Sequence, residues 1–446
     1  MKKAFLVYIG IFLSLSSYAQ VQEFSMQEAI DFAIENNRTA KNAARDVDAA
    51  VKQKWETIAT GLPQISASLS YNNFLKQPVS LIPAEFFGGN PGEFAEIAFG
   101  TKQSVNAIAV LNQKVFDGSY LVGLQSAKVF LEISQNAKEK TDLEVRKAVI
   151  NAYGNVLLAE ESVTILERNK TVLKKNLDET TKIYENGLAE EEDVEQLKIT
   201  LAGIESNLNN TIRLKDLAYQ MFNMTIGIDI DEEVKLTDFL SGLASQNTVI
   251  SLLDAEDNIE NTIDYRIASN DKRSKELLVK LEKSKALPTI DAFVNGGYDG
   301  YSNQFTFTTP GQRWFGSSIF GVSMNIPIFS SLQRTAATQR AKINLEKSED
   351  DLVETRQRIK LEIATAKSNY RFSIEDYEIK KDNLKLAERI ESKNQTKFFE
   401  GISSSFELRQ AQTQLYSAQQ ELLQSMLDVI NRKAQLETVL NEVPKN

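Results

Sequence analysis

The chain has 446 residues, with 51 basic and 61 acidic side chains and a net charge of −10 at neutral pH. It contains neither cysteine nor histidine, which excludes disulfides, thiolate nucleophiles, Ser-His-Asp triads and nearly all zinc sites. The acidic balance argues against a nucleic acid partner, and no phosphate-binding glycine loop is present, so we expect neither an enzyme nor a cofactor.

The first twenty residues have the pattern of a secretory signal peptide. Lys2 and Lys3 form a basic start, residues 4–15 are predominantly apolar, and Ala19 is a small residue suited to cleavage. The apolar run is too short to span a bilayer as a helix. We therefore expect residues 1–19 to be removed on export, which leaves a mature chain with a net charge of −12.

The remaining sequence contains two copies of one pattern. "GLP" at Gly61 matches "ALP" at Ala286, a shift of 225 residues, and "NQKVF" at Asn112 matches "NIPIF" at Asn325, a shift of 213. Each copy reads as helix, strand, loop, strand, long helix, turn and helix. A period this long indicates a duplicated half rather than a solenoid repeat.

The shift changes within the copies. "YENGLAEEEDVEQL" at Tyr184 matches "FFEGISSSFELRQA" at Phe398, a shift of 214. The fall from 225 places about 12 extra residues in the first copy. We expect them in a loop between residues 72 and 103.

Four segments alternate between apolar and polar residues, with the period of two that is typical of strands. In "QISASLSYN", Ile65, Ala67, Leu69 and Tyr71 share one face. The other three segments are "SVNAIAVLN", "TIDAFVNGGY" and "FGVSMNIPI". A soluble sandwich with one wet face and an outer-membrane barrel both fit this alternation. The export signal and the aromatic residues of "GYDGYSNQFTFTTPGQRWFG" favour the barrel.

The sequence predicts no strands besides these four. Four strands cannot close into a barrel, and an open sheet edge in hydrocarbon leaves backbone groups unpaired at a cost of several kcal/mol each. We therefore expect other copies of the chain to complete the sheet.

Two very long helices are predicted, from Ser119 to Asn186 and from Leu332 to Glu400, because no proline interrupts either segment. The helices that follow them keep steps of three and four between apolar residues, which is typical of a coiled-coil seam. The seam positions of the two copies match at a shift of 214 and are Val194, Leu197, Leu201, Ile204, Leu208 and Leu408, Ala411, Leu415, Ala418, Leu422.

The order of these features resembles the TolC-type outer-membrane efflux proteins over essentially the whole mature chain. The resemblance rests on "LP" before a serine-rich strand, on "NIPIF" entering a helix, and on the two matching glycine turns. It implies an α+β membrane protein in which each copy gives four strands to a 12-stranded transmembrane β-barrel and long coiled-coil helices to a periplasmic tunnel.

The resemblance also implies a function and partners. The expected protein is a homotrimer in the outer membrane, with a large periplasmic part. It is a passive exit duct of a tripartite efflux or type I secretion system, for small molecules or polypeptides. Its partners are a periplasmic adaptor, an inner-membrane pump of RND, ABC or MFS type, and outer membrane lipid. A soluble periplasmic coiled-coil scaffold and an adaptor protein remain as alternatives.

In this family the two helix turns form the periplasmic mouth and the surface that docks the adaptor. The matching positions are Gly187, Leu188, Asp193 and Val194 in the first turn, and Gly401, Ile402, Glu407 and Leu408 in the second. Glycine suits the left-handed residue of such turns. The alternative is that both turns are ordinary helix-hairpin tips.

The residues that constrict the mouth in some family members are only partly present. Their positions correspond to Phe398, Ser403, Glu407 and Gln410, so one acid remains and no arginine is found. We expect the run "AEEED" from 189 to 193 to supply the negative charge of the mouth instead, and the alternative is that this run is simply solvated.

The pattern divides the chain into eight segments. These are a signal peptide (1–19), N-terminal periplasmic helices (20–60), a first transmembrane hairpin (61–118), a first helical hairpin (119–225), an inter-repeat segment (226–285), a second transmembrane hairpin (286–331), a second helical hairpin (332–435) and a tail (436–446).

Overall fold

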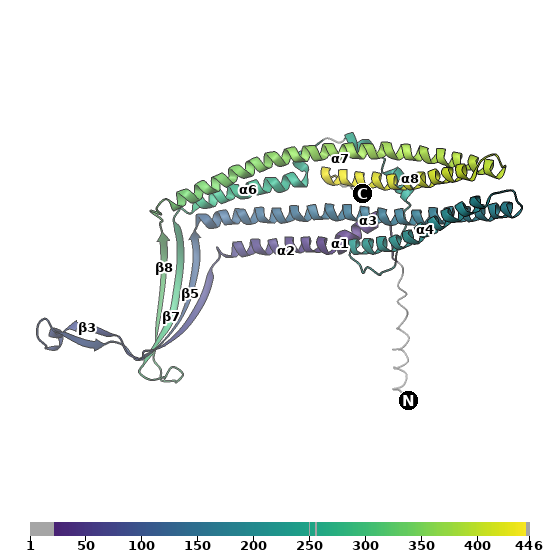
Figure 1. Cartoon of the computed structure of the whole chain (residues 1–446). Coiled ribbons are helices and arrows are strands. Elements are labelled where there is room, and N and C mark those ends of the chain that lie inside the picture. Colours follow the sequence, from purple (N-terminus) through teal and green to yellow (C-terminus); the bar gives the residue numbers. More distant parts are fainter. Residues whose placement is uncertain (1–21, 249, 255–256, 443–446) are drawn as a thin grey trace, which may run out of the picture. The chain divides into compact units, whose positions relative to one another are not determined.

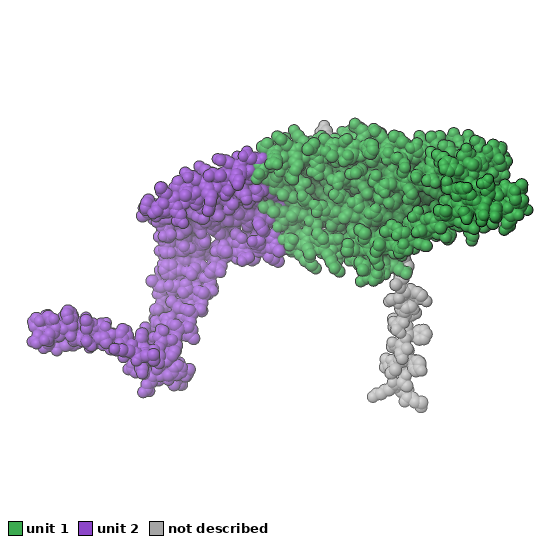
Figure 2. Space-filling view, in the orientation of Figure 1, with its two compact units in different colours: residues 1–48, 133–269, 351–446 green, residues 49–132, 270–350 purple. Residues whose placement is uncertain are grey.

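The computed structural model describes residues 22–248, 250–254 and 257–442. The expected signal peptide and the last four residues of the expected tail lie outside this part. The chain forms two compact units, coloured separately in Figure 2. Of the described residues, unit 1 contains those within 22–48, 133–269 and 351–442, and unit 2 contains residues 49–132 and 270–350.

Unit 2 is built around the four predicted strands, which form one antiparallel sheet in the order β2-β5-β7-β8 (Figure 1). Their bounds are Gln64–Asn73 (β2), Gln103–Phe116 (β5), Thr289–Ser302 (β7) and Trp314–Asn325 (β8). Within the described residues, β2 and β8 each have one unpaired edge. The prediction of a four-stranded sheet with two open edges is therefore confirmed.

The two hairpins of this sheet have the same register. In the first hairpin Gln64 lies opposite Asn112. The residue equivalent to Gln64 is Thr289, at a shift of 225, and the residue equivalent to Asn112 is Asn325, at a shift of 213. Thr289 and Asn325 lie opposite each other in the second hairpin. The duplication read from the sequence is thus a duplication of strand pairing.

The alternation of the strands is preserved across the sheet. One row of paired residues crosses all four strands on the apolar face. It consists of Ile65, Leu111, Val294 and Phe320, in the order of the strands in the sheet. The opposite face is more polar, and there the Asn106 side chain donates a hydrogen bond of 2.6 Å to Asp299.

An aromatic cluster covers one end of the apolar face. The rings of Phe305 and Phe307, from the β7–β8 loop, pack edge-on against Tyr71 of β2, and Phe307 also contacts Trp314. A Cβ at Gly300 would lie 3.0 Å from the Trp314 ring and 3.3 Å from the Phe307 ring. A glycine here leaves room for the loop to fold back onto the sheet.

The prediction that the chain has only four strands is wrong. The long loop between β2 and β5 contains a second hairpin of β3 (Val79–Pro83) and β4 (Phe94–Ala98), joined by the short helix η1 (Ala84–Phe87). In unit 1, β1 (Gln22–Phe24) pairs in parallel with β6 (Val234–Leu236). These strands have three to five residues, which is too short for alternation to be recognised.

The helices have the predicted lengths. The two longest, α3 and α7, have 68 and 67 residues and differ from the predicted bounds by one residue at each end.

None of the helices in the described ranges combines the length and apolar character needed to cross a bilayer. The helices are α1 (Met26–Asn36), α2 (Arg38–Ala59), α3 (Gly118–Glu185), α4 (Glu191–Ile226), α5 (Leu240–Gln246), η2 (Ile250–Asp254), η3 (Ile259–Asn261), α6 (Ile263–Ser284), α7 (Gln333–Phe399) and α8 (Ser405–Leu440).

The core of unit 1 joins the short strands to the long helices. Phe24, Tyr153 and Phe222 are buried and their rings pack edge-on. The Tyr153 hydroxyl donates to the Phe24 carbonyl at 3.0 Å and lies 2.9 Å from a carboxylate oxygen of Asp238. These contacts hold β1 against α3 and α4.

A buried ion pair links α3 and α8 in the same unit. Arg146 and Glu437 lie 2.7 Å apart, with side chains that are 10% and 6% exposed. Lys433 lies 3.6 Å from the same carboxylate. Both charges are therefore compensated inside the packed helices, as a buried charge requires.

Candidate functional site: the two helix-hairpin tips

The first tip joins α3 to α4 through a Schellman turn. The Gly187 N–H donates to the Tyr184 carbonyl at 2.8 Å, and the Leu188 N–H donates to the Ile183 carbonyl at 3.0 Å. These two bonds satisfy carbonyls that have no partner within the helix. Gly187 has φ of +73°, in the region that residues with a Cβ adopt only at a cost.

The second tip, between α7 and α8, repeats this geometry. The Gly401 N–H donates to the Phe398 carbonyl at 3.0 Å, and the Ile402 N–H donates to the Lys397 carbonyl at 2.8 Å. Gly401 has φ of +71°. The prediction that both glycines have positive φ is confirmed. The hydrogen bonds of the two tips also join equivalent residues, whose numbers differ by 214.

One predicted mouth acid, Asp193, takes part in a helix cap, and the other, Glu407, lies beside one. The Asp193 carboxylate accepts the Glu190 N–H at 3.4 Å in a capping box, at the start of α4. At the start of α8, the Ser404 hydroxyl accepts the Glu407 N–H at 3.3 Å. The Ser403 hydroxyl donates to the Glu407 carboxylate. This bond to the carboxylate lowers the pKa of Glu407, and a hydrogen bond from the Ser404 backbone N–H lowers it further.

Val194 and Leu408 are buried, with 5% and 1% of their surfaces exposed. They begin the predicted seams, in which Leu197, Ile204 and Leu208 are also buried on α4. The structure therefore places these two residues in the packing between helices and away from the surface that a partner could contact.

The exposed apolar residues of the tips are Leu188 and Ile402, which are 81% and 72% exposed. Phe406, on the first turn of α8, is 59% exposed. The predicted constriction residues lie close by: Phe398 is half-buried and packs edge-on against Phe399, and Gln410 is exposed. The structure thus separates the proposed site into an exposed apolar pair and a set of capping and packing residues.

A contact between the two tips was not predicted. Arg409 of α8 donates a hydrogen bond of 2.7 Å to the Gln196 side chain of α4 and lies 5.5 Å from the centre of the Phe406 ring. The positions that match Arg409 and Gln196 in the other copy are Glu195 and Gln410. Because the bond joins positions that are not equivalent, the repeat gave no signal for it.

Polar side chains also connect the two hairpins away from the tips. Asn169 of α3 donates to Gln419 of α8 at 2.9 Å, and Gln395 of α7 donates to Asn176 of α3 at 3.2 Å. Asn176 is fully buried. Burial raises the pKa of Glu391, an acid on α7.

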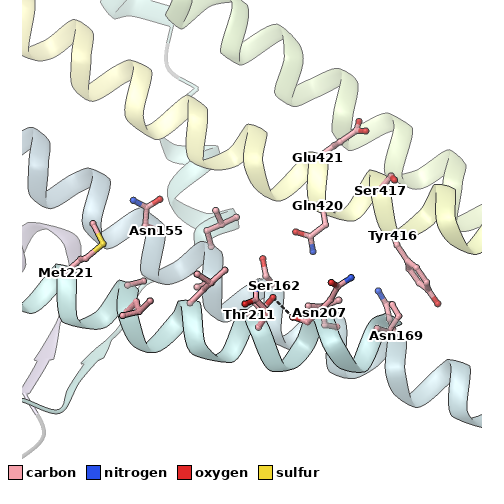
Figure 3. A pocket seen from close by; sticks show the side chains of 18 of the residues that line it. Asn155, Ser162, Asn169, Asn207, Thr211, Met221, Tyr416, Ser417, Gln420 and Glu421 are labelled. Atoms are coloured by element: carbon pink, nitrogen blue, oxygen red, sulfur yellow. Dashed lines mark hydrogen bonds between the residues drawn. The ribbon is translucent and has the colours of Figure 1, made fainter. Parts of the chain in front are cut away.

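A groove of about 930 Å³ lies between α3, α4 and α8 (Figure 3). Its lining includes the apolar residues Leu158, Leu214 and Met221. Figure 3 shows that hydroxyl and amide side chains stand along its length, and these are Asn155, Ser162, Asn169, Asn207, Thr211, Tyr416, Ser417 and Gln420. In the part of the chain that the structure describes, no three acidic side chains are grouped to hold a metal ion.

Comparison with known proteins assigns the chain to a family. The outer membrane efflux protein family matches residues 29–220 and 266–442, which includes both copies of the repeat. The chain belongs to this family.

Individual relatives agree with this assignment. Outer membrane protein TolC of Escherichia coli is 23% identical over 458 residues, covering 99% of this chain and 87% of TolC. The TolC of Vibrio cholerae is 22% identical over 448 residues, covering 98% and 94%. Among solved structures, Vibrio cholerae VceC superposes with a TM-score of 0.70 at 14% identity, and the Campylobacter jejuni CmeC channel with 0.73 at 16%. VceC is matched over 93% of this chain and 95% of its own, and CmeC over 94% and 85%.

Family membership confirms several predictions. This efflux protein has the α+β fold of TolC-type channels and is located in the outer membrane. It is a passive channel and not an enzyme, because TolC-type efflux channels are non-enzymatic. The alternatives of a soluble scaffold and of an adaptor protein are excluded by this membership.

Proposed function

We propose that three copies of this efflux protein form the exit duct of a tripartite efflux or type I secretion system. In this proposal, residues 61–118 and 286–331 of each copy contribute four strands to a 12-stranded barrel. Residues 119–225 and 332–435 form the periplasmic tunnel. Two open sheet edges in unit 2 support the assembly, since unpaired backbone groups are costly in lipid.

The observation that carries the docking role is the matched exposure of Leu188 and Ile402. Both side chains follow a Schellman glycine, and both are more than two-thirds exposed although they are large and apolar. An apolar residue after the glycine of a Schellman turn commonly packs on the preceding turn of the helix, but Leu188 and Ile402 are too exposed to be covered in this way. Two apolar residues at equivalent tips therefore favour an apolar partner, which we take to be a periplasmic adaptor linked to an inner-membrane pump of RND, ABC or MFS type.

The double variant Leu188→Asp and Ile402→Asp tests the docking role. Burying two unpaired carboxylates in an apolar interface should weaken adaptor binding by at least about 3 kcal/mol, which is more than a hundredfold in affinity. Assembly should persist, because neither residue belongs to the buried seams. The matched control is Phe239→Asp, whose side chain is 72% exposed but lies at the start of α5.

The readouts are in-cell crosslinking to the adaptor and export of cargo, whether small molecules or polypeptides. We expect the tip variant to lose both while it remains in the outer membrane, and the Phe239 control to keep both. Normal export by an assembled tip variant would show that the tips are not the docking surface.

A further inference from the structure

A second hairpin, β3–β4, lies in the long connection between β2 and β5, at the ends of these strands that are remote from α2 and α3. We call residues 74–102 the arm. Figures 1 and 2 show the arm standing out from the rest of unit 2. Within the described residues, β3 and β4 pair only with each other. In the proposed duct α3 is periplasmic, so the arm lies at the opposite, outer end of the barrel.

The far end of the arm carries three exposed phenylalanines. Phe86 and Phe87 belong to η1 and are 78% and 63% exposed, and Phe94, at the start of β4, is 62% exposed. Phe94 lies opposite Pro83, the residue directly before η1. The three rings therefore belong to the same end of the hairpin, which we call the phenylalanine tip.

The phenylalanine tip suits neither hydrocarbon nor water. In hydrocarbon, the open edges of β3 and β4 would leave backbone N–H and carbonyl groups unpaired. In water, a two-stranded hairpin without further cover is only marginally stable, and the exposed rings remain in unfavourable contact with solvent. Residues 77–101 contain three acids and no basic residue, so the arm offers no cation to lipid phosphates. A protein surface is therefore the partner that suits the tip.

The proposed duct places further copies of the arm within reach. Twelve strands spaced by about 4.8 Å and tilted by about 40° give a barrel with a radius of roughly 12 Å. The five residues of β3 span about 17 Å, and residues 74–78 add to this length. Each arm is thus long enough to bring its tip to the barrel axis, where the three copies meet.

We infer that the phenylalanine tip packs on the same tip of the neighbouring copies and covers the outer opening of the duct. This inference rests on the proposed trimer and adds a contact outside the four-stranded sheet. Association would bury the rings and give each hairpin the cover that it lacks in a single chain. Glu85 and Glu93 border the rings and are exposed, so their carboxylates stay in water at the rim of the contact. The arms thereby narrow the outlet, and leaving cargo displaces them.

Cysteine crosslinking tests the contact, since the natural chain has no cysteine. Phe87→Cys places one thiol at each tip, where a short bifunctional maleimide should join two copies. Phe94→Cys is a second tip variant, and one of the two suffices if the other does not assemble. The matched control is Leu75→Cys, at the base of the arm and 94% exposed. Equivalent positions on a rim of this radius lie roughly 20 Å apart, beyond the reach of the reagent.

The full-length variants are treated on intact cells and run on denaturing gels. We expect a covalent dimer with both tip variants and a monomer band with Leu75→Cys. A monomer band with all three, in a protein that native mass spectrometry shows to be trimeric, would overturn the tip contact and leave the duct intact. A crosslink to a different protein in place of the dimer would also overturn it. A monomer in native mass spectrometry would overturn the proposed assembly itself.

Quenching by brominated lipid distinguishes the tip contact from insertion into the membrane. The probe is Phe87→Trp in a chain that also carries Trp55→Phe and Trp314→Phe, because the natural chain has two tryptophans. In vesicles, we expect its fluorescence to be unaffected by the brominated lipid. Strong quenching would place the tip in lipid and refute contact between copies.

The conductance of the assembled protein in planar bilayers tests the covering of the outlet. The triple variant Phe86→Ser, Phe87→Ser and Phe94→Ser removes the apolar contact and keeps the length of the arm. We expect a higher single-channel conductance than that of the natural protein, with Leu75→Ser as a control that leaves it unchanged. If the triple variant conducted like the natural protein, the tips would not cover the opening.

Discussion

Replacing Gly187 by alanine adds a single methyl group to the first helix tip. The backbone there has φ of +73°, and an added Cβ would meet nothing within 4 Å. The cost is therefore conformational and not steric, and a residue with a Cβ in the left-handed region costs about 1–2 kcal/mol. A penalty of this size should increase local opening of the turn about 5- to 30-fold.

Hydrogen exchange at the tip measures this opening. The Gly187 and Leu188 amides donate to the carbonyls of Tyr184 and Ile183, so their exchange reports directly on the Schellman turn. Gly187→Asn should show a smaller increase than Gly187→Ala, because asparagine tolerates the left-handed conformation better.

Gly203 provides a control with the opposite expected sign. It lies inside α4 without positive φ, and its Cβ would also meet open space. Alanine there should stabilise the helix by about 1 kcal/mol, so exchange in α4 should slow or stay unchanged. Unchanged exchange at the tip of Gly187→Ala, or equal loosening by Gly203→Ala, would refute the argument from backbone conformation.

Three further predictions follow from single features of the structure. Burial raises the pKa of Glu391. The protonated side chain therefore contributes to folding stability below about pH 4, where glutamate in the unfolded chain is also protonated. This contribution is lost as the pH rises through the raised pKa of the folded state. Glu391→Gln should therefore raise the melting temperature at pH 7 but not at pH 3.5; a pH-independent difference would contradict this. Arg146→Met should lower the free energy of unfolding by up to about 3 kcal/mol, because the buried Glu437 loses its closer partner and keeps only Lys433 at 3.6 Å. The added change Glu437→Leu should restore most of the loss in chemical denaturation. If the double variant were no more stable than the single one, burial of the carboxylate would not be the cause. A tag inserted at Gly89, in the long loop, should be labelled on intact cells, whereas labelling only after the outer membrane is broken would refute a surface location.

Features that repeat or alternate along the chain could be predicted from the sequence. The shifts of 225 and 213 predicted two equivalent hairpins, and the pairs Gln64–Asn112 and Thr289–Asn325 show that they share one register. The alternation in the strands, the uninterrupted helices and the glycines at 187 and 401 were predicted for the same reason. Each depends on local backbone geometry, which neighbouring residues specify.

The exposure of the individual tip residues could not be predicted from the sequence and is known from the packing of the helices. The sequence grouped Val194 and Leu408 with Leu188 and Ile402, but the first two are buried between helices and the last two are not. An apolar residue near a helix start is compatible with either outcome. The choice depends on where the neighbouring helix lies.

Contacts between positions that are not equivalent also came from the structure alone. Arg409 reaches Gln196 over 213 residues of sequence, and Arg146 reaches Glu437 over 291. Nothing periodic marks either pair, and many other charged residues on these helices are simply solvated. Such pairs form because the packing of the helices brings two particular surfaces together. Which surfaces meet depends on all the contacts between the helices, so no single segment of sequence predicts the pair.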